Sequence, residues 1–121
     1  MTAGWSIPVK ALDALTLTST VQFSDPIDLN EVMDRHAGQT VITYATGDMW
    51  IVSLQGSLDG VKWTEVATLA VNGGPPAASS GEVVVPVIAT DKPARYLRVY
   101  GQQFSTGSPV TTVWLTSSAT N

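Results

Sequence analysis

The chain has 121 residues, of which 44% are hydrophobic and only 13% charged, and its formal net charge is −4. This length suits one domain with a single core, and the charged share is about half of the roughly 25% that is usual. With six Lys and Arg residues, no cysteine and no long apolar run, the composition argues against a dense phosphate-binding patch, disulfides and a membrane span, so we expect neither nucleic acid nor a membrane as a partner.

Residues 1–11 are predicted to form an irregular N-terminal arm. They show no apolar period, and Pro8 disfavours a helix immediately before it. Trp5 either packs on its own domain or anchors the arm on a neighbouring subunit. We therefore take Trp5, Ile7 and Pro8 as candidate partner-binding residues and place the domain itself at residues 12–121.

From residue 12 onward, short segments rich in Val, Leu and Thr predict β-strands, because their apolar residues alternate with polar ones. Asp25-Pro26 breaks the first of these strands, and Pro86 indicates an edge position or a bulge. Only residues 30–36 have helical character, as a single turn capped by Asn30. The segments that contain the expected strands are 15–23, 27–29, 39–47, 49–57, 62–71, 82–90, 91–103 and 110–118.

About eight short strands at this spacing, separated by turn residues, are typical of an all-β fold. We predict a single antiparallel β-sandwich with a jelly-roll-like topology. The loop at residues 72–81, NGGPPAASSG, has the densest Gly, Pro and Ser content of the chain and cannot pack regularly.

The stretch GSLDGVKWTEV, residues 56–66, predicts a hairpin. Asp59-Gly60 is a strong signal for a type I′ turn, which needs positive φ at both central residues. The Ser57 and Asp59 side chains can bind the backbone of the turn, and Trp63 would then bury its indole against the opposite sheet. We interpret these four residues as a structural motif.

Ser57, Asp59, Gly60 and Trp63, followed by the segment RYLRV at residues 95–99, resemble a motif pair of discoidin-type and galactose-binding-like sandwiches. The same pair resembles small β-sandwich virion proteins of tailed bacteriophages, including head decoration and tail-associated proteins. The second resemblance covers more of the chain, from the SDPIDL segment at residues 24–29 to the closing strand.

The phage resemblance implies a non-enzymatic structural protein of the virion, assembled in the host cytoplasm, that decorates and stabilises a capsid. Its partners would be the major capsid protein and neighbouring copies of itself, with trimers common among such proteins. The alternative is a carbohydrate-binding or tail-associated adhesion module, with a glycan as the partner.

We expect no catalytic residue, no cofactor and no metal. His36 beside Asp34 lacks the flanking sequence of a catalytic triad, and we interpret it as a surface histidine in a polar turn. The Asp residues near loops do not form the Asp-x-Asp-x-Asp-Gly motif that binds calcium. These loop carboxylates are Asp25, Asp28, Asp34 and Asp48.

The best candidate surface for a ligand or a partner is one face of the strand that contains Tyr96, Arg98 and Tyr100. Against a ligand role, Arg98 resembles an arginine that pairs with a carboxylate for structural reasons in such folds. Trp50 and Trp114 lie mid-strand, which favours core or subunit contacts over a sugar site.

Overall fold

The computed structural model describes residues 5–119, which form nine strands and no helix. No helix long and apolar enough to cross a membrane occurs within that range. The strands are β1 (Val9–Thr16), β2 (Gln22–Phe23), β3 (Ile27–Met33), β4 (Arg35–Tyr44), β5 (Trp50–Ser57), β6 (Thr64–Asn72), β7 (Gly81–Ala89), β8 (Ala94–Gln103) and β9 (Val110–Ser118).

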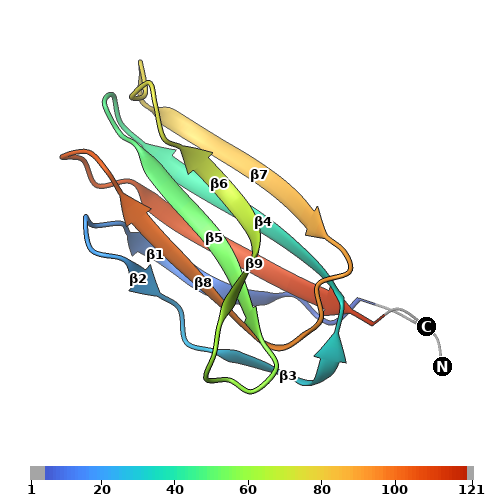
Figure 1. Ribbon diagram of the computed structural model, residues 1–121. Helices are drawn as coiled ribbons and strands as arrows, with labels where there is room; N and C mark the ends of the chain where they lie inside the picture. The colour runs from blue at the N-terminus through green and yellow to red at the C-terminus, as the bar shows by residue number, and fades with distance from the viewer. Residues whose placement is uncertain (1–4, 120–121) are drawn as a thin grey trace.

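Two antiparallel sheets lie face to face (Figure 1). Sheet A has the strand order β1-β9-β4-β7, and sheet B has the order β2-β8-β5-β6, with β3 also paired to β8. Most connections cross from one sheet to the other. The all-β antiparallel sandwich predicted from the sequence is confirmed.

The core lies between the sheets, because each strand directs alternate side chains inward. In β5, Trp50, Val52 and Leu54 are all buried, as their spacing predicts. Leu97 and Val99 of the neighbouring strand β8 are buried on the same side of the sheet. Pro86 lies in β7, which pairs only with β4 among the described residues and therefore forms an edge of sheet A.

The helical turn expected at residues 30–36 does not form, since residues 30–33 belong to β3, Asp34 connects the two strands, and residues 35–36 begin β4. Asn30 has a φ of 68° and donates its N–H to Asp28 Oδ1 at 2.8 Å. This left-handed residue interrupts the register of β3 against β8 instead of capping a helix. Pairing with β8 outweighs the weak local preference for a helix.

The arm is shorter than the eleven residues expected, since β1 already begins at Val9. Ser6 N–H donates to the Ser117 carbonyl at 2.8 Å, and Ser117 N–H donates to Ser6 Oγ at 3.0 Å. These two bonds continue the pairing of the N-terminal segment with β9 back to Ser6. The first four residues of the predicted arm lie outside the described part of the chain.

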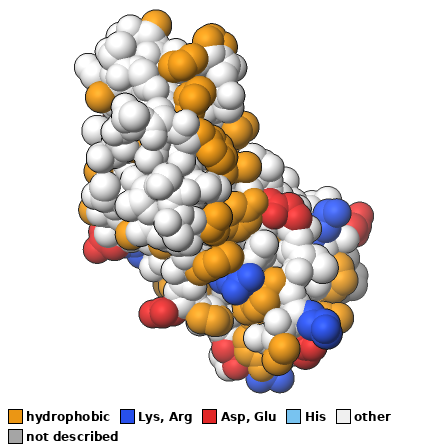
Figure 2. Space-filling view, turned by 60° about the vertical axis from the view of Figure 1, so that its left-hand side comes forward, with side chains coloured by type: hydrophobic (Ala, Val, Ile, Leu, Met, Phe, Trp, Pro, Cys, Tyr) orange, Lys and Arg blue, Asp and Glu red, His pale blue; other side chains and the backbone are white. Residues whose placement is uncertain are grey.

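Charge is distributed unevenly along the sandwich. One end carries the loops 17–21, 45–49, 73–80 and 104–109, and the only ionisable residue in them is Asp48, which is 2% exposed. We call this the neutral end. Figure 2 shows the Lys, Arg, Asp and Glu side chains of the face in view gathered toward the lower part of the molecule, where Figure 1 places β3 and the β5–β6 loop.

Candidate functional site

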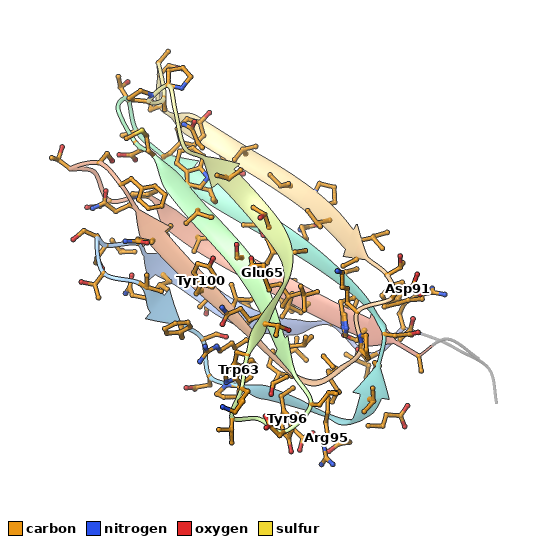
Figure 3. The ribbon with its side chains drawn as sticks, in the orientation of Figure 1. Trp63, Glu65, Asp91, Arg95, Tyr96 and Tyr100 are labelled. Atoms are coloured by element: carbon orange, nitrogen blue, oxygen red, sulfur yellow. The ribbon has the colours of Figure 1, made fainter. Side chains whose placement is uncertain are left out.

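The outer side of β8 brings together the three residues that the sequence singled out. Tyr96, Arg98 and Tyr100 are half-buried and alternate with the buried Leu97 and Val99, as predicted. Figure 3 shows Tyr96 and Tyr100 on this side of sheet B, with Trp63 and Glu65 from neighbouring segments beside them.

Arg98 is held between two aromatic rings. Its guanidinium carbon lies 4.1 Å from the ring centre of Phe23 and 4.4 Å from that of Trp63. The Arg98 Nε–H donates to Gln55 Oε1 at 2.7 Å. Phe23 in turn lies 6.0 Å from the Tyr100 ring. We call Phe23, Trp63, Arg98 and Tyr100 the Arg98 cluster.

Two sequence-based expectations about this region are wrong. Trp63 is half-buried under Arg98 on the outer side of sheet B, because it lies in the β5–β6 loop just before the strand and not inside it. The contacts of Arg98 are aromatic rings and an amide rather than a carboxylate. The arginine that pairs with a carboxylate is Arg95, whose Nε lies 3.1 Å from Asp28 Oδ1.

The Arg95–Asp28 pair lies at the surface beside the cluster. Arg95 donates a second hydrogen bond to Asp28 Oδ2 at 3.3 Å, and these bonds, with the Asn30 N–H, hold the pKa of Asp28 below its ordinary value. Arg95 also lies over the Tyr96 ring at 5.3 Å. Exposed pairs of this kind add little stability.

The Ser57 and Asp59 side chains bind the β5–β6 loop, as the sequence indicates. Asp59 Oδ1 accepts the N–H groups of Val61 and Lys62 at 2.8 and 2.9 Å, and these bonds lower the pKa of Asp59. Ser57 Oγ donates to Asp59 Oδ1 and accepts the Gly60 N–H.

The prediction of a type I′ turn is wrong, however. Of the residues in the β5–β6 loop, only Gly60 has a positive φ, 78°, and the loop runs from residue 58 to residue 63 instead of turning in two residues. Two central residues with positive φ would be needed for the expected turn. The carboxylate of Asp59 organises a wider loop.

Gly60→Ala should therefore lower the free energy of unfolding by about 1–2 kcal/mol, because an L-residue is strained at this φ. A Cβ there would also touch the Tyr96 ring at 3.5 Å. Gly73→Ala is the matched control, since a Cβ at Gly73 meets nothing within 4 Å. Equal urea midpoints for the two variants would contradict the assigned loop conformation.

His36 is a buried residue of β4 and not the surface histidine that the sequence suggested. Its Nδ1 lies 2.7 Å from Ser117 Oγ and its Nε2 lies 2.8 Å from the Lys92 carbonyl. Because a carbonyl can only accept, Nε2 carries the proton and Nδ1 accepts from Ser117. Burial lowers the pKa of His36. The hydrogen bond to the Lys92 carbonyl fastens the β7–β8 loop to sheet A. Because His36 and Ser117 are both buried, their pair is closed to a substrate.

In residues 5–119, no three His, Asp or Glu side chains lie close enough together to hold a metal ion. Asp48 is enclosed at the neutral end, where its Oδ2 accepts the Ala45 N–H at 2.8 Å. Asp28 is bound to Arg95. Two of the carboxylates considered for calcium, Asp48 and Asp28, thus bind separate partners within the protein.

The outer side of sheet A is a second exposed surface. Pro8 and residues of β4, β7 and β9 line an open groove of about 580 Å³ on this side. We call the residues Pro8, Ala37, Val84, Pro86, Ile88 and Trp114 the apolar face. Of the arm residues, Trp5 packs under Arg35 of its own β4 at 4.9 Å, Ile7 is exposed, and Pro8 lines the groove.

No family model and no curated protein sequence matches the chain. Solved structures do resemble it. VP2 of infectious bursal disease virus, in a subviral particle, has 10% sequence identity and a TM-score of 0.62 over 97% of this chain and 32% of VP2. The PBSX exported protein XepA has 15% identity and a TM-score of 0.61 over 95% of this chain and 38% of XepA.

The similarity is one of fold. A pilus protein of Bacillus endospore appendages also resembles the chain, with 14% identity and a TM-score of 0.51 over all of this chain and 93% of that one. The chain spans about a third of the length of the viral proteins it resembles. The likeness to discoidin-type domains stays a resemblance of two short motifs, since no family model carries it.

Proposed function

We propose that the chain is a non-enzymatic structural component of a virion that attaches to the shell of a phage capsid as a decoration protein. The observation that carries this proposal is the fold, which is shared over nearly the whole chain with VP2 of a subviral particle and with a protein of a viral particle of infectious bursal disease virus. The similar XepA and the endospore pili are likewise built on it.

The Arg98 cluster is the surface we propose for the contact with the major capsid protein. Arg, Trp and Tyr are the residues most enriched among those that dominate binding energy at protein interfaces. Stacking and the Gln55 hydrogen bond already fix Arg98 in the free protein, so little side-chain entropy is lost on binding. The neighbouring Asp28–Arg95 pair supplies a charged rim.

Glycan binding is less well supported as the function of this surface. A sugar stacks on an open aromatic face, whereas Arg98 covers one face each of Phe23 and Trp63. Tyr96 is similarly approached by Arg95. The rings are thus engaged within the protein itself.

Co-sedimentation of the purified protein with phage capsids that lack it tests the proposal. We expect saturable binding by the wild type and a loss of about thirtyfold in affinity for Arg98→Ala, the size of a typical hot-spot effect. Lys62→Ala, in the exposed part of the β5–β6 loop, is the control and should bind like the wild type.

Circular dichroism and thermal melting would show that each variant is folded. Absence of binding by the folded wild type would reject the decoration role, and binding of the protein to a glycan array would then favour the adhesion alternative. Wild-type binding that Arg98→Ala leaves unchanged would reject the cluster as the attachment surface.

A further inference from the structure

The apolar face of sheet A is exposed to an unusual degree for a sheet surface. Ile88 is 69% exposed, Val84 51% and Trp114 38%. A contiguous apolar surface with a groove is typical of an interaction site rather than of a surface that water covers. The symmetry of the residues on this face indicates which partner fits it.

Trp114, Gln39 and Pro86 form one row across the sheet, since Gln39 is paired with Trp114 in β9 and with Pro86 in β7. The residues on either side of this row match each other in kind. Along β7, Ile88 and Val84 lie two residues from Pro86 in opposite directions; along β4, Ala37 and Val41 lie two residues from Gln39.

The charges at the two ends of the face match as well. Arg35 lies four residues before Gln39 in β4, and Glu82 lies four residues before Pro86 in β7. Because β4 and β7 are antiparallel, Arg35 and Glu82 lie at opposite ends of the face, at equal distances from the central row.

We propose that the apolar face is an interface between two copies of this chain, related by a twofold axis along the row of Trp114, Gln39 and Pro86. Such an axis reverses the strands of the second copy. Ile88 of each copy then faces Val84 of the other, and Arg35 of each copy lies beside the other's Glu82. The two Gln39 amides face each other and can exchange hydrogen bonds.

Lys10 also lies on the row, paired with Trp114, and its Nζ lies 5.0 Å from the centre of the Trp114 ring. Asp13 Oδ1 lies 3.5 Å from its Nζ and offsets the charge. The twofold axis brings the two Lys10–Asp13 pairs toward each other, and each pair carries no net charge.

Pairing of strand edges is disfavoured as an alternative arrangement of the two copies. The edges of sheet A are β7 and β1. Pro86 in the middle of β7 has no N–H to donate to an added strand, and the register of β1 against β9 is interrupted twice, as in an edge strand with bulges. Face-to-face packing leaves both edges unpaired. The face measures roughly 15 Å by 30 Å from standard strand spacings, less than the roughly 800 Å² per partner of a stable complex, so we expect a weak dimer.

Analytical ultracentrifugation of the protein alone, from about 10 µM to about 1 mM, tests this inference. We expect reversible dimerisation, with a dissociation constant raised at least about tenfold by Ile88→Asp. Val61→Asp is the matched control, because Val61 is equally exposed in the β5–β6 loop on the other sheet and should leave the dimer unchanged.

A charge exchange provides the decisive comparison. Arg35→Glu and Glu82→Arg should each weaken the dimer, and the double variant should restore it, since the exchanged charges again face each other. A protein that stays monomeric, a dimer that ignores Ile88→Asp, or a double variant no better than the single ones would each overturn the inference. The experiment contains no capsid, and Arg98→Ala should dimerise normally, so failure here is separate from failure of the decoration role.

Discussion

His36→Ala should lower the free energy of unfolding at pH 7.5 by about 3 kcal/mol, as expected for a buried side chain whose two hydrogen-bonded partners are left unpaired beside a cavity. The residue is 1% exposed and joins Ser117 of β9 to the Lys92 carbonyl of the β7–β8 loop. Urea denaturation measures the loss. Thr43→Ala, an exposed position of the same strand, should change little by comparison.

The same histidine should make the wild type less stable as the pH falls from about 6.5 toward 5. Burial lowers the pKa of His36 in the folded state, so below about 6.5 the unfolded chain binds a proton that the folded chain does not. The contribution of His36 to the free energy of unfolding is therefore complete above about pH 6.5 and is lost as the pH decreases. Asp28 and Asp59 have lowered pKa values, so they change the stability only in more acidic solution.

His36→Gln separates this effect from the structural one, because glutamine keeps an N–H near the Lys92 carbonyl but does not titrate. We expect the stability of the Gln variant to be flat between pH 7.5 and 5.5. A wild type whose stability is also flat, or a variant that loses as much as the wild type, would contradict the assigned role of His36.

The strands were predictable where burial depends on the segment itself. The alternation of Trp50, Val52 and Leu54 indicates a strand with one buried face whatever the partner strands are. Pro86 restricts its strand to an edge for the equally local reason that it lacks an N–H. The sandwich follows from many such segments with turn residues between them.

Burial of His36 depends instead on contacts distant in sequence. Asp34 and Gly38 around it suggest a polar turn, yet His36 pairs with Ser117, and Lys92 covers it from a third segment. No local pattern predicts which strand lies beside it. A partnered histidine can therefore be buried in a segment that looks like a surface turn.

The candidate site was predictable only where it depends on the local pattern of one strand. Alternation along β8 places Tyr96, Arg98 and Tyr100 on one side. Phe23 reaches them only because β2 pairs with β8 at Tyr100, and Trp63 only because the β5–β6 loop folds over the strand. The sequence therefore predicts the strand face but not the two rings that hold Arg98.

Gly107→Ala should lower the free energy of unfolding by about 2–3 kcal/mol, although it adds a single methyl group to a loop. A Cβ at Gly107 would overlap the Asp48 carboxylate and lie 2.7 Å from its Cγ. Asp48 has little room to move: its Oδ2 accepts the Ala45 N–H, and its carbonyl accepts the Ala77 N–H and the Asn72 Nδ2.

Asp48 thus joins three loops of the neutral end, and a double-mutant cycle tests this directly. If the carboxylate is what the methyl group displaces, Gly107→Ala should cost far less in an Asp48→Ala background than in the wild type, which makes the two changes strongly non-additive. Gly73→Ala, in a loop of the same end with open space around it, should add normally to Asp48→Ala. Additive costs for Asp48 and Gly107 would mean that the loops relax independently. Non-additive costs would mean that one buried carboxylate fixes this uncharged end as a rigid unit, the condition under which a loop surface binds a partner with little loss of entropy.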